Sequence, residues 1–150
     1  MEFSRLAVYL ALGYFVSLSQ RRGQRLARQA SIDPLTGVTN GRGFAERLGA
    51  EVKRAGRYPR PLGVICIDCD DLKSVNDRFG HAEGDRLLAA LAQAIVASVR
   101  DIDLVARVGG DEFTVLSPES TVEQATATAQ RLGRNIRERG FHTRNGETLR

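Results

Sequence analysis

The most informative part of this chain is the sequence Arg107-Val108-Gly109-Gly110-Asp111-Glu112-Phe113. It lies between two short apolar runs, 103–106 before it and 113–116 after it. Two β-prone runs separated by Gly-Gly and two acids are typical of a β-hairpin with carboxylates at its tip. Glycine allows the tight turn because it reaches positive φ without a steric cost. Taken alone, these seven residues also fit a solvated turn that has no function.

A second group of carboxylates follows the upstream run 62–67, Leu-Gly-Val-Ile-Cys-Ile. This continuous apolar run predicts a central strand that is covered on both faces. It ends in Asp68-Cys69-Asp70-Asp71, and carboxylates this close together repel each other unless a cation lies among them. One or two of them could cap a helix that begins at Leu72, but capping needs one acid and not three. A hard divalent cation, bound through carboxylate and backbone oxygens, explains the cluster better.

The remaining segments predict helices that flank these strands. Asn40 caps a first helix with Phe44, Leu48 and Val52 on one face. After a turn over 78–85, a second helix has an apolar face made of Leu87, Leu88, Leu91, Ile95 and Val99. Ser120-Thr121-Val122-Glu123 fits a capping box, and Gly140 ends the helix that presents Val122, Ala125, Ala129, Leu132 and Ile136. This order predicts an α/β (α+β) sandwich, in which helices flank a central sheet that contains antiparallel strands.

Such a sheet would bring the two acidic segments together. If the run 62–67 and the hairpin are neighbours, Asp68 lies close to Asp111 and Lys73 lies one helical turn away. Divalent cations held by paired carboxylates clamp phosphate groups and activate an attacking oxygen. Lysine is a suitable point charge for a polyphosphate. The residues therefore predict metal-dependent phosphoryl or nucleotidyl transfer.

The charge distribution argues against nucleic acid as a partner. The formal net charge is +4, but residues 1–30 hold five basic residues and one acid, and the other 120 residues hold 17 of each. The globular part therefore has no basic bias. The two cysteines, Cys66 and Cys69, have no second pair to complete a zinc site. We interpret them as structural thiols in a reducing compartment, with Cys66 buried in its strand.

Residues 1–30 are separate in character from residues 31–150, which we expect to form the globular domain. The uncharged apolar run 6–18 is shorter than the ~20 residues that span a bilayer core, and arginines follow it closely. It could be the end of a transmembrane helix, an interfacial anchor or a buried helix. We favour the first, which predicts a domain at the cytoplasmic face of the inner membrane, with a cytoplasmic protein as the alternative. The basic segment 20–30 would be a helical linker.

Ordered motifs along the chain resemble those of the GGDEF family, the diguanylate cyclases. They are Asp33-Pro34-Leu35-Thr36-Gly37, Ile67-Asp68-Cys69-Asp70, Lys73-Ser74-Val75-Asn76-Asp77, Phe79-Gly80-His81, Gly84-Asp85 and Ala106 to Phe113. The resemblance implies a palm-like α/β fold similar to nucleotide cyclases and polymerases. It also implies that the protein condenses two GTP into cyclic di-GMP and releases two pyrophosphates.

The resemblance further implies roles for single residues. Two Mg²⁺ ions, or Mn²⁺, would be bound in each active site by Asp68, the Cys69 carbonyl and Asp111. Asp111 would accept the proton of the attacking 3′-hydroxyl, with Glu112 as a competing candidate. Lys73 would stabilise the charge that develops on the phosphates.

Other positions would bind the substrate. The resemblance implies that Asn76 and Asp85 hydrogen-bond the guanine edge. The amides near Asp71 and Leu72 would cradle the phosphates, and Gly109 and Gly110 would let the backbone pass close to GTP. Each domain would hold one GTP, so catalysis would need a homodimer.

A second site would bind the product. Arg100 and Asp103 match the family's RxxD motif, and Arg131 matches a further product-binding arginine. From position alone these residues could be a surface ion pair of little energetic weight. The resemblance instead implies inhibition by cyclic di-GMP, and bidentate bonding makes arginine suitable for guanine and phosphate.

The chain departs from the family pattern in three places. Leu72 stands where phenylalanine is usual, and Asn40-Gly41-Arg42 replaces Asn-Arg-Arg. The family's C-terminal strand and helix do not follow Arg150, so we expect a truncated GGDEF domain. One alternative is an inactive domain that acts as a cyclic di-GMP receptor. Another is a non-functional fragment with an unpaired sheet edge.

Overall fold

The structure, a computed structural model, describes residues 31–57, 60–143 and 146–149. Its elements are β1 (Thr39–Asn40), α2 (Gly41–Arg57), β2 (Leu62–Asp68), α3 (Leu72–Phe79), α4 (His81–Val96), β3 (Leu104–Arg107), β4 (Glu112–Pro118), α5 (Val122–Arg139), β5 (Phe141–His142) and β6 (Thr148–Leu149). The apolar run 6–18 and the linker 20–30 lie outside the described residues. None of the described helices combines the length and apolar character that crossing a bilayer would need.

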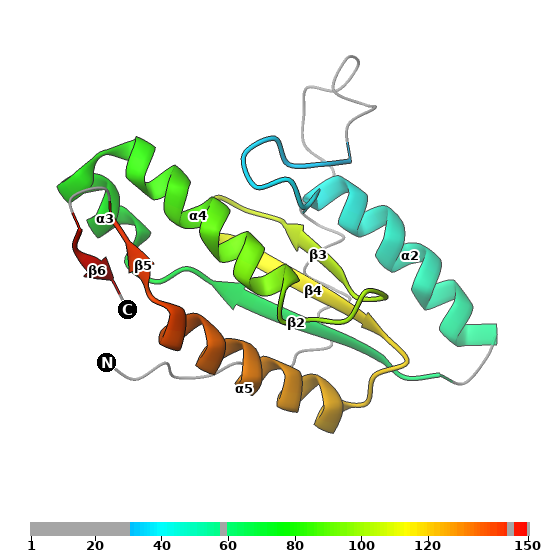
Figure 1. The fold of residues 1–150 in the computed structure, drawn as a ribbon. Helices are drawn as coiled ribbons and strands as arrows, with labels where there is room; N and C mark the ends of the chain where they lie inside the picture. Colours follow the sequence, from blue (N-terminus) through cyan, green and yellow to red (C-terminus); the bar gives the residue numbers. More distant parts are fainter. Residues whose placement is uncertain (1–30, 58–59, 144–145, 150) are drawn as a thin grey trace, which may run out of the picture.

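A four-stranded sheet in the order β1-β3-β4-β2 organises the domain (Figure 1). The predicted hairpin is confirmed, because β3 and β4 pair antiparallel with Arg107 opposite Phe113. β2 is antiparallel to β4, with Asp68 opposite Glu112, and β1 runs parallel to β3. The sheet is therefore mixed and contains antiparallel strands, as the sequence predicts.

Helices cover both faces of this sheet. α4 and α5 pack on one face, over a core that includes Ile65, Ile95 and Val115 (Figure 1). α2 packs on the other face through Phe44, which belongs to the same core cluster as Ala106 and Leu116. Successive residues of a strand point to opposite faces, so Val115 and Leu116 belong to different cores. The predicted α/β sandwich is confirmed.

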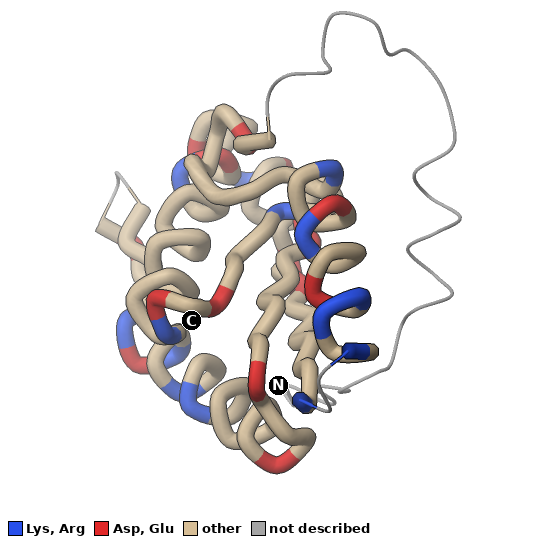
Figure 2. Tube along the Cα trace, turned by 90° about the vertical axis from the view of Figure 1, so that its right-hand side faces the viewer, with Lys and Arg blue, Asp and Glu red and all other residues tan. Residues whose placement is uncertain are grey.

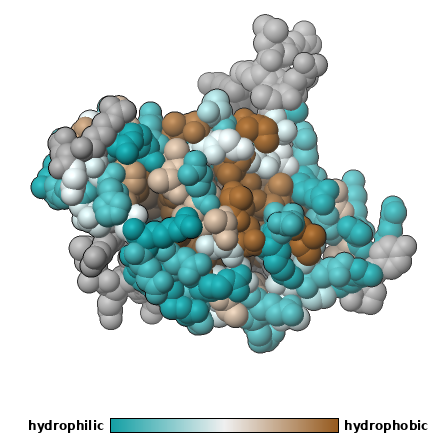
Figure 3. All heavy atoms as spheres, in the orientation of Figure 1, coloured by the Kyte–Doolittle hydropathy of each residue, from teal (hydrophilic) through white to brown (hydrophobic). Residues whose placement is uncertain are grey.

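The surface has the character expected of such a sandwich. On the face with α4 and α5, apolar side chains show mainly in the middle, around α4 and β3, and polar residues surround them (Figure 3). Basic and acidic residues are interspersed over the described part of the chain (Figure 2), in agreement with the balanced charge of residues 31–150.

Our prediction that β2 is a central strand is wrong for the described sheet, where β2 pairs only with β4. Its apolar run has another cause, since Ile65 packs against one core while Leu62 and Val64 pack against the other. A strand that is covered on both faces shows a continuous apolar run even when only one of its edges is paired. Cys66 is exposed and not buried, because the core beneath α2 ends at Val64. Both cysteines are free thiols, as expected.

Two helix boundaries also differ from our predictions. α4 begins at His81, directly after Gly80, whose φ of 86° joins it to α3. The expected turn over 78–85 is therefore mostly helix, and Asp85 lies beyond the first turn of α4. That helix ends at Val96, so Val99 lies outside it, although Val99 still packs against the core.

The capping box of α5 is shifted by one residue from the predicted position. Thr121 is the N-cap, and its Oγ1 accepts a hydrogen bond from the Gln124 amide at 3.3 Å. The Gln124 side chain in turn accepts from the Thr121 amide at 2.9 Å. Val122, predicted on the apolar face, is 61% exposed because it begins the helix. Gly140 ends the helix as predicted.

The cap gives a stability prediction. Thr121→Ala removes the side-chain acceptor of the Gln124 amide, so we expect the free energy of unfolding to fall by about 1 kcal/mol. Urea denaturation measures the change. Gln130→Ala, at an exposed position within α5, is the matched control and should change stability little. Equal effects from both substitutions would show that the cap contributes nothing.

Candidate active site

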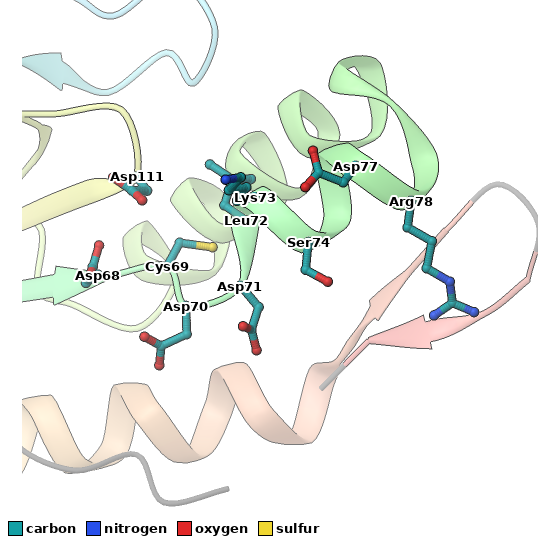
Figure 4. Close-up of a pocket in the computed structure, with 10 residues that line it drawn as sticks. All are labelled: Asp68, Cys69, Asp70, Asp71, Leu72, Lys73, Ser74, Asp77, Arg78 and Asp111. Atoms are coloured by element: carbon teal, nitrogen blue, oxygen red, sulfur yellow. The ribbon is translucent and has the colours of Figure 1, made fainter.

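An open cleft of about 720 Å³ lies where β2 ends, β4 begins and α3 starts (Figure 4). Most of its polar side chains come from the segment after β2 and from one face of α3. The lining residues are Asp68, Cys69, Asp70, Asp71, Leu72, Lys73, Ser74, Asp77, Arg78 and Asp111. The cleft thus lies at the end of β2 beside the hairpin tip, where the sequence predicts that the two acidic segments meet.

Asp68 and Asp111 lie together at one end of the cleft (Figure 4). The antiparallel register brings the end of β2 to the start of β4, and the Cys69 amide donates to the Asp111 carbonyl at 3.1 Å. Burial and the charges of Asp111 and Asp70 raise the pKa of Asp68 above its ordinary value. The predicted pairing of these two carboxylates is confirmed.

The acids after β2 do not serve as helix caps. Asp71 is the N-cap residue of α3, yet its side chain makes no capping hydrogen bond. Its backbone is left-handed, with φ 62° and ψ 13°, a conformation that non-glycine residues adopt only at a cost of order 1–3 kcal/mol. Local helix formation therefore does not explain the cluster. Strained positions of this kind gather at functional sites.

The charge of the cleft requires a cation if the ligand is an anion. Five carboxylates line it, at positions 68, 70, 71, 77 and 111, against the two cations Lys73 and Arg78. The formal charge of the lining is therefore −3. A polyphosphate would meet net repulsion here unless divalent cations entered with it.

The donor set suits a hard cation that shares its ligands with a substrate. Within the described ranges, no three His, Cys, Asp or Glu side chains are grouped so as to hold a metal ion. Two carboxylates and the Cys69 carbonyl are available instead. Mg²⁺ often uses only one or two carboxylates, completed by waters and substrate phosphates. The residues present fit such an ion.

Cys69 would contribute to such a cation site through its backbone carbonyl and not through its thiol. Burial, with the charges of Asp111, Asp68 and the neighbouring acids, raises the pKa of its thiol to about 11. The thiol therefore stays protonated at neutral pH and packs against the core as a small apolar group.

Several residues predicted to be catalytic or to bind the substrate lie outside the lining of this cleft. Asn76 points from α3 toward Gly84 of α4, where a Cβ would come within 2.0 Å of the Asn76 Oδ1. Asp85 follows Gly84 and is exposed. The structure thus places Asn76 where α3 and α4 meet, and Asp85 at an exposed position of α4 that follows Gly84. Glu112 folds back over Gly109, where a Cβ would come within 2.4 Å of the Glu112 Oε2, and Gly110 is exposed.

Some lining residues were not singled out as site residues from the sequence. Ser74, Asp77 and Arg78 follow Asp70 and Asp71 at intervals of three and four residues. This spacing places them on one face of α3, so helical periodicity could have identified them.

The residues of the predicted product site lie near one another. Arg100 pairs with Asp103, with 3.5 Å between its Nε and the Asp103 Oδ2, and its amide donates to the same oxygen at 3.0 Å. Arg131 donates to the Ser98 carbonyl at 3.1 Å, which places it beside the turn that carries Arg100. The Asp103 side chain is only 1% exposed, and its Oδ1 has no hydrogen-bond partner among the residues described.

The mixed sheet and the acid-bearing strand ends define a palm-like α/β domain of the nucleotide-cyclase type. Comparison with known proteins gives the family. The model of the family "Diguanylate cyclase, GGDEF domain" matches residues 30–149, so the chain belongs to this family.

Relatives and solved structures agree with this assignment. The diguanylate cyclase DgcP of Pseudomonas aeruginosa is 38% identical over 122 residues, which are 81% of this chain and 18% of DgcP. The GGDEF domain of TpbB from the same organism superposes with a TM-score of 0.74 at 36% identity, covering 79% of this chain and 69% of that one. The GGDEF domain of DgcB from Caulobacter crescentus, solved in complex with c-di-GMP, gives 0.76 at 25% identity, covering 86% and 74%. The chain spans only 18–34% of the length of the curated relatives DgcP, TpbB and YhcK.

Proposed function

We propose that the protein is a diguanylate cyclase that condenses two GTP into cyclic di-GMP and releases two pyrophosphates. The observation that carries this proposal is the position of Asp68 and Asp111, side by side at the ends of adjacent strands in a GGDEF domain. The relatives named as diguanylate cyclases support it.

Asp68, Asp111 and the Cys69 carbonyl would hold Mg²⁺, or Mn²⁺, in this cleft. A divalent cation supplies charge neutralisation and activation of the attacking oxygen when it is bound. Lys73 would bind the phosphates as a point charge, next to the amides of Asp71 and Leu72 at the start of α3. The Asp111 carboxylate would accept the proton of the attacking 3′-hydroxyl, and Glu112 is the competing acceptor.

Asn76 and Asp85 would read the guanine base between α3 and α4. An amide and a carboxylate together offer the donors and acceptors that the guanine edge requires. The lack of a side chain at Gly84 leaves the space that the Asn76 amide occupies.

Gly84→Ala tests this arrangement. The new methyl group would come within 2.0 Å of the Asn76 Oδ1 and 3.3 Å of the Leu72 Cδ1. Because the Oδ1 is the far end of its side chain, we expect the Asn76 amide to turn away at little cost in stability. We expect the KM for GTP to rise about tenfold, the effect of losing 1.4 kcal/mol of binding, with little change in Tm. Gly49→Ala is the matched control, because its added methyl meets open space on α2. Equal KM values for the two variants would contradict guanine recognition by Asn76.

Catalysis would take place in a homodimer, with one GTP in each copy. The 3′-hydroxyl of each nucleotide would attack the α-phosphate of the other, so the approach of two half-sites would control the rate. Residues 1–30 would lead into domain 31–150 and, if 6–18 ends a membrane helix, hold it at the cytoplasmic face of the inner membrane.

Product inhibition, or a receptor function, would use Arg100, Asp103 and Arg131. Arg100, whose side chain is 46% exposed, would contact the ligand, and Asp103, whose side chain is only 1% exposed, would hold the Arg100 side chain in place. We expect Arg100→Ala to weaken cyclic di-GMP binding about tenfold or more, as loss of a charge-assisted contact does, while initial GTP turnover persists. Isothermal titration calorimetry measures the affinity for cyclic di-GMP. An affinity of Arg100→Ala equal to that of the wild type would exclude Arg100 from the binding of cyclic di-GMP.

An assay of the purified full-length protein with GTP and Mg²⁺ tests the proposed activity. We expect cyclic di-GMP from GTP, none from ATP, and none in the presence of excess EDTA. Tight cyclic di-GMP binding that depends on Arg100, without any turnover of GTP, would establish the receptor alternative instead.

A further inference from the structure

The Arg107 side chain connects the hairpin tip with the start of the domain. It stands at the end of β3, and its Nε and Nη2 donate to the Gly110 carbonyl at 3.2 and 2.6 Å. Its Nη1 donates to the Asp33 Oδ1 at 3.3 Å. The pair is largely shielded from water, with side-chain exposures of 15% for Arg107 and 18% for Asp33. All three contacts use the fixed geometry of the guanidinium fork.

These contacts hold the peptide that precedes Asp111. The Gly110 carbonyl belongs to the same peptide plane as the Asp111 amide, so Arg107 fixes the orientation of that plane. On the other side, the Asp111 carbonyl accepts from the Cys69 amide at 3.1 Å. Both peptide planes that flank Asp111 are therefore anchored. The direction in which its carboxylate leaves the backbone follows from these two anchors.

Asp33 holds the other end of the connection. Its Oδ1 also accepts from the Thr36 amide at 3.0 Å and from the Thr36 hydroxyl at 2.6 Å. Burial opposes ionisation of Asp33, but these hydrogen bonds and Arg107 outweigh it and lower its pKa. The carboxylate is thus charged and fixed when it meets the guanidinium.

Backbone hydrogen bonds hold the turn that carries Asp33, which lies at the start of the described chain. The Asp33 amide donates to the Val38 carbonyl at 2.8 Å, and the Asn40 amide donates to the Ser31 carbonyl at 2.9 Å. β1 then pairs with β3, with Asn40 opposite Arg107. A displacement at Ser31 would therefore move Asp33 relative to Arg107.

We propose that Arg107 is a positioning residue for Asp111, and that the Asp33–Arg107 pair couples the chain entering at Ser31 to the geometry of the catalytic carboxylate. This inference rests on the proposed function. Asp33 orients the guanidinium, and the guanidinium orients the Gly110–Asp111 peptide. That peptide in turn sets the direction of the Asp111 Cα–Cβ bond, which carries the carboxylate. Lysine cannot replace arginine here, because one ammonium lacks the fork that spans both partners.

The test compares Arg107→Gln, Arg107→Lys and Asp33→Asn in the full-length protein. A misplacement of a reacting group by about 1 Å can cost 10²-fold in rate, so we expect kcat to fall about 10²-fold in Arg107→Gln and not to recover in Arg107→Lys. With Mg²⁺ at a saturating concentration, the KM for GTP should stay within about twofold, because the base and phosphate contacts remain. Asp33→Asn should lose about tenfold, and the double variant should be no slower than Arg107→Gln alone, since coupled residues are not additive.

Direct binding of Mn²⁺, followed by electron paramagnetic resonance, separates this proposal from the proposed function. Arg107→Gln should weaken Mn²⁺ binding at least threefold, whether or not the wild-type protein makes cyclic di-GMP. Arg60→Gln, which breaks an exposed ion pair with Glu119, is the matched control and should leave both readouts unchanged. A purely structural role for Arg107 predicts a lowered Tm with unchanged Mn²⁺ affinity and additive rate effects, and that result would overturn the proposal.

Discussion

Asp111→Asn is expected to abolish the formation of cyclic di-GMP while the domain stays folded. The substitution keeps the shape of the side chain but removes one of the two paired carboxylates of the cleft. It takes away both a proton acceptor and a cation ligand. Loss of a general base alone costs typically 10²–10⁴-fold, so we expect at least about 10³-fold less product. Chromatography of the nucleotides after incubation with GTP and Mg²⁺ measures this loss.

The matched control for this substitution is Glu138→Gln, which removes one negative charge at an exposed position of α5. It should retain the wild-type rate. Glu112→Gln distinguishes the two candidate proton acceptors, because Glu112 lies outside the lining of the cleft. Lost turnover with intact Mn²⁺ binding in Glu112→Gln would assign the proton to Glu112. An Asp111→Asn protein with normal turnover would exclude Asp111 from the chemistry.

Asp68→Asn is expected to remove activity to a similar extent and at the same time to raise the Tm of the metal-free protein. Burial and the charges of Asp111 and Asp70 raise the pKa of Asp68, so its ionised form is less favourable in the folded chain than in the unfolded one. Above the unfolded pKa of about 4, this ionisation lowers the stability of the wild-type protein. Asparagine carries no charge and escapes the repulsion.

The pH dependence of this effect has a definite sign. As the pH falls through the raised pKa of Asp68 toward its unfolded value, the wild-type protein gains stability and the Tm advantage of Asp68→Asn shrinks. Mg²⁺ should raise the Tm of the wild-type protein more than that of the variant, because a ligand stabilises the state that binds it. Thermal melts at several pH values, with and without Mg²⁺, measure both effects. A variant that melts below the wild type at neutral pH without metal would contradict the repulsion.

The sequence predicted the parts of the fold that depend on local pattern. The apolar runs around Gly109-Gly110 predicted the hairpin, and that hairpin, together with the run 62–67, placed Asp68 beside Asp111. The pattern of apolar residues along a strand indicates which of its faces are covered. It does not report which edges are paired, and for this reason β2 was wrongly predicted to be central.

The predicted helix boundaries were wrong where two local sequence signals compete. Gly80, His81 and Gly84 resemble a loop, yet a single positive φ at Gly80 joins α3 to α4. Ser120 and Thr121 both fit an N-cap position. In the structure Thr121 is the N-cap, and the Gln124 side chain accepts the reciprocal hydrogen bond of the capping box, as a glutamate at that position would.

The connection through Arg107 could not be predicted at all from local pattern. It depends on the parallel pairing of β1 with β3, which brings Asp33 to a residue that is distant in the sequence. The guanidinium then reaches Gly110 only because the hairpin turn folds back toward the end of β3. Tertiary geometry of this kind leaves no periodic signal in the chain.

In the proposed function, the paired carboxylates Asp68 and Asp111 serve the condensation of two GTP molecules. The most direct measurement follows GTP consumption, pyrophosphate release and cyclic di-GMP formation together, in one reaction of purified full-length protein with GTP and Mg²⁺. We predict one cyclic di-GMP and two pyrophosphates for every two GTP consumed by the wild-type protein. With Asp111→Asn, we predict no consumption of GTP, no release of pyrophosphate and no formation of cyclic di-GMP. Consumption of GTP without cyclic di-GMP, or equal turnover by Asp111→Asn, would contradict the claim.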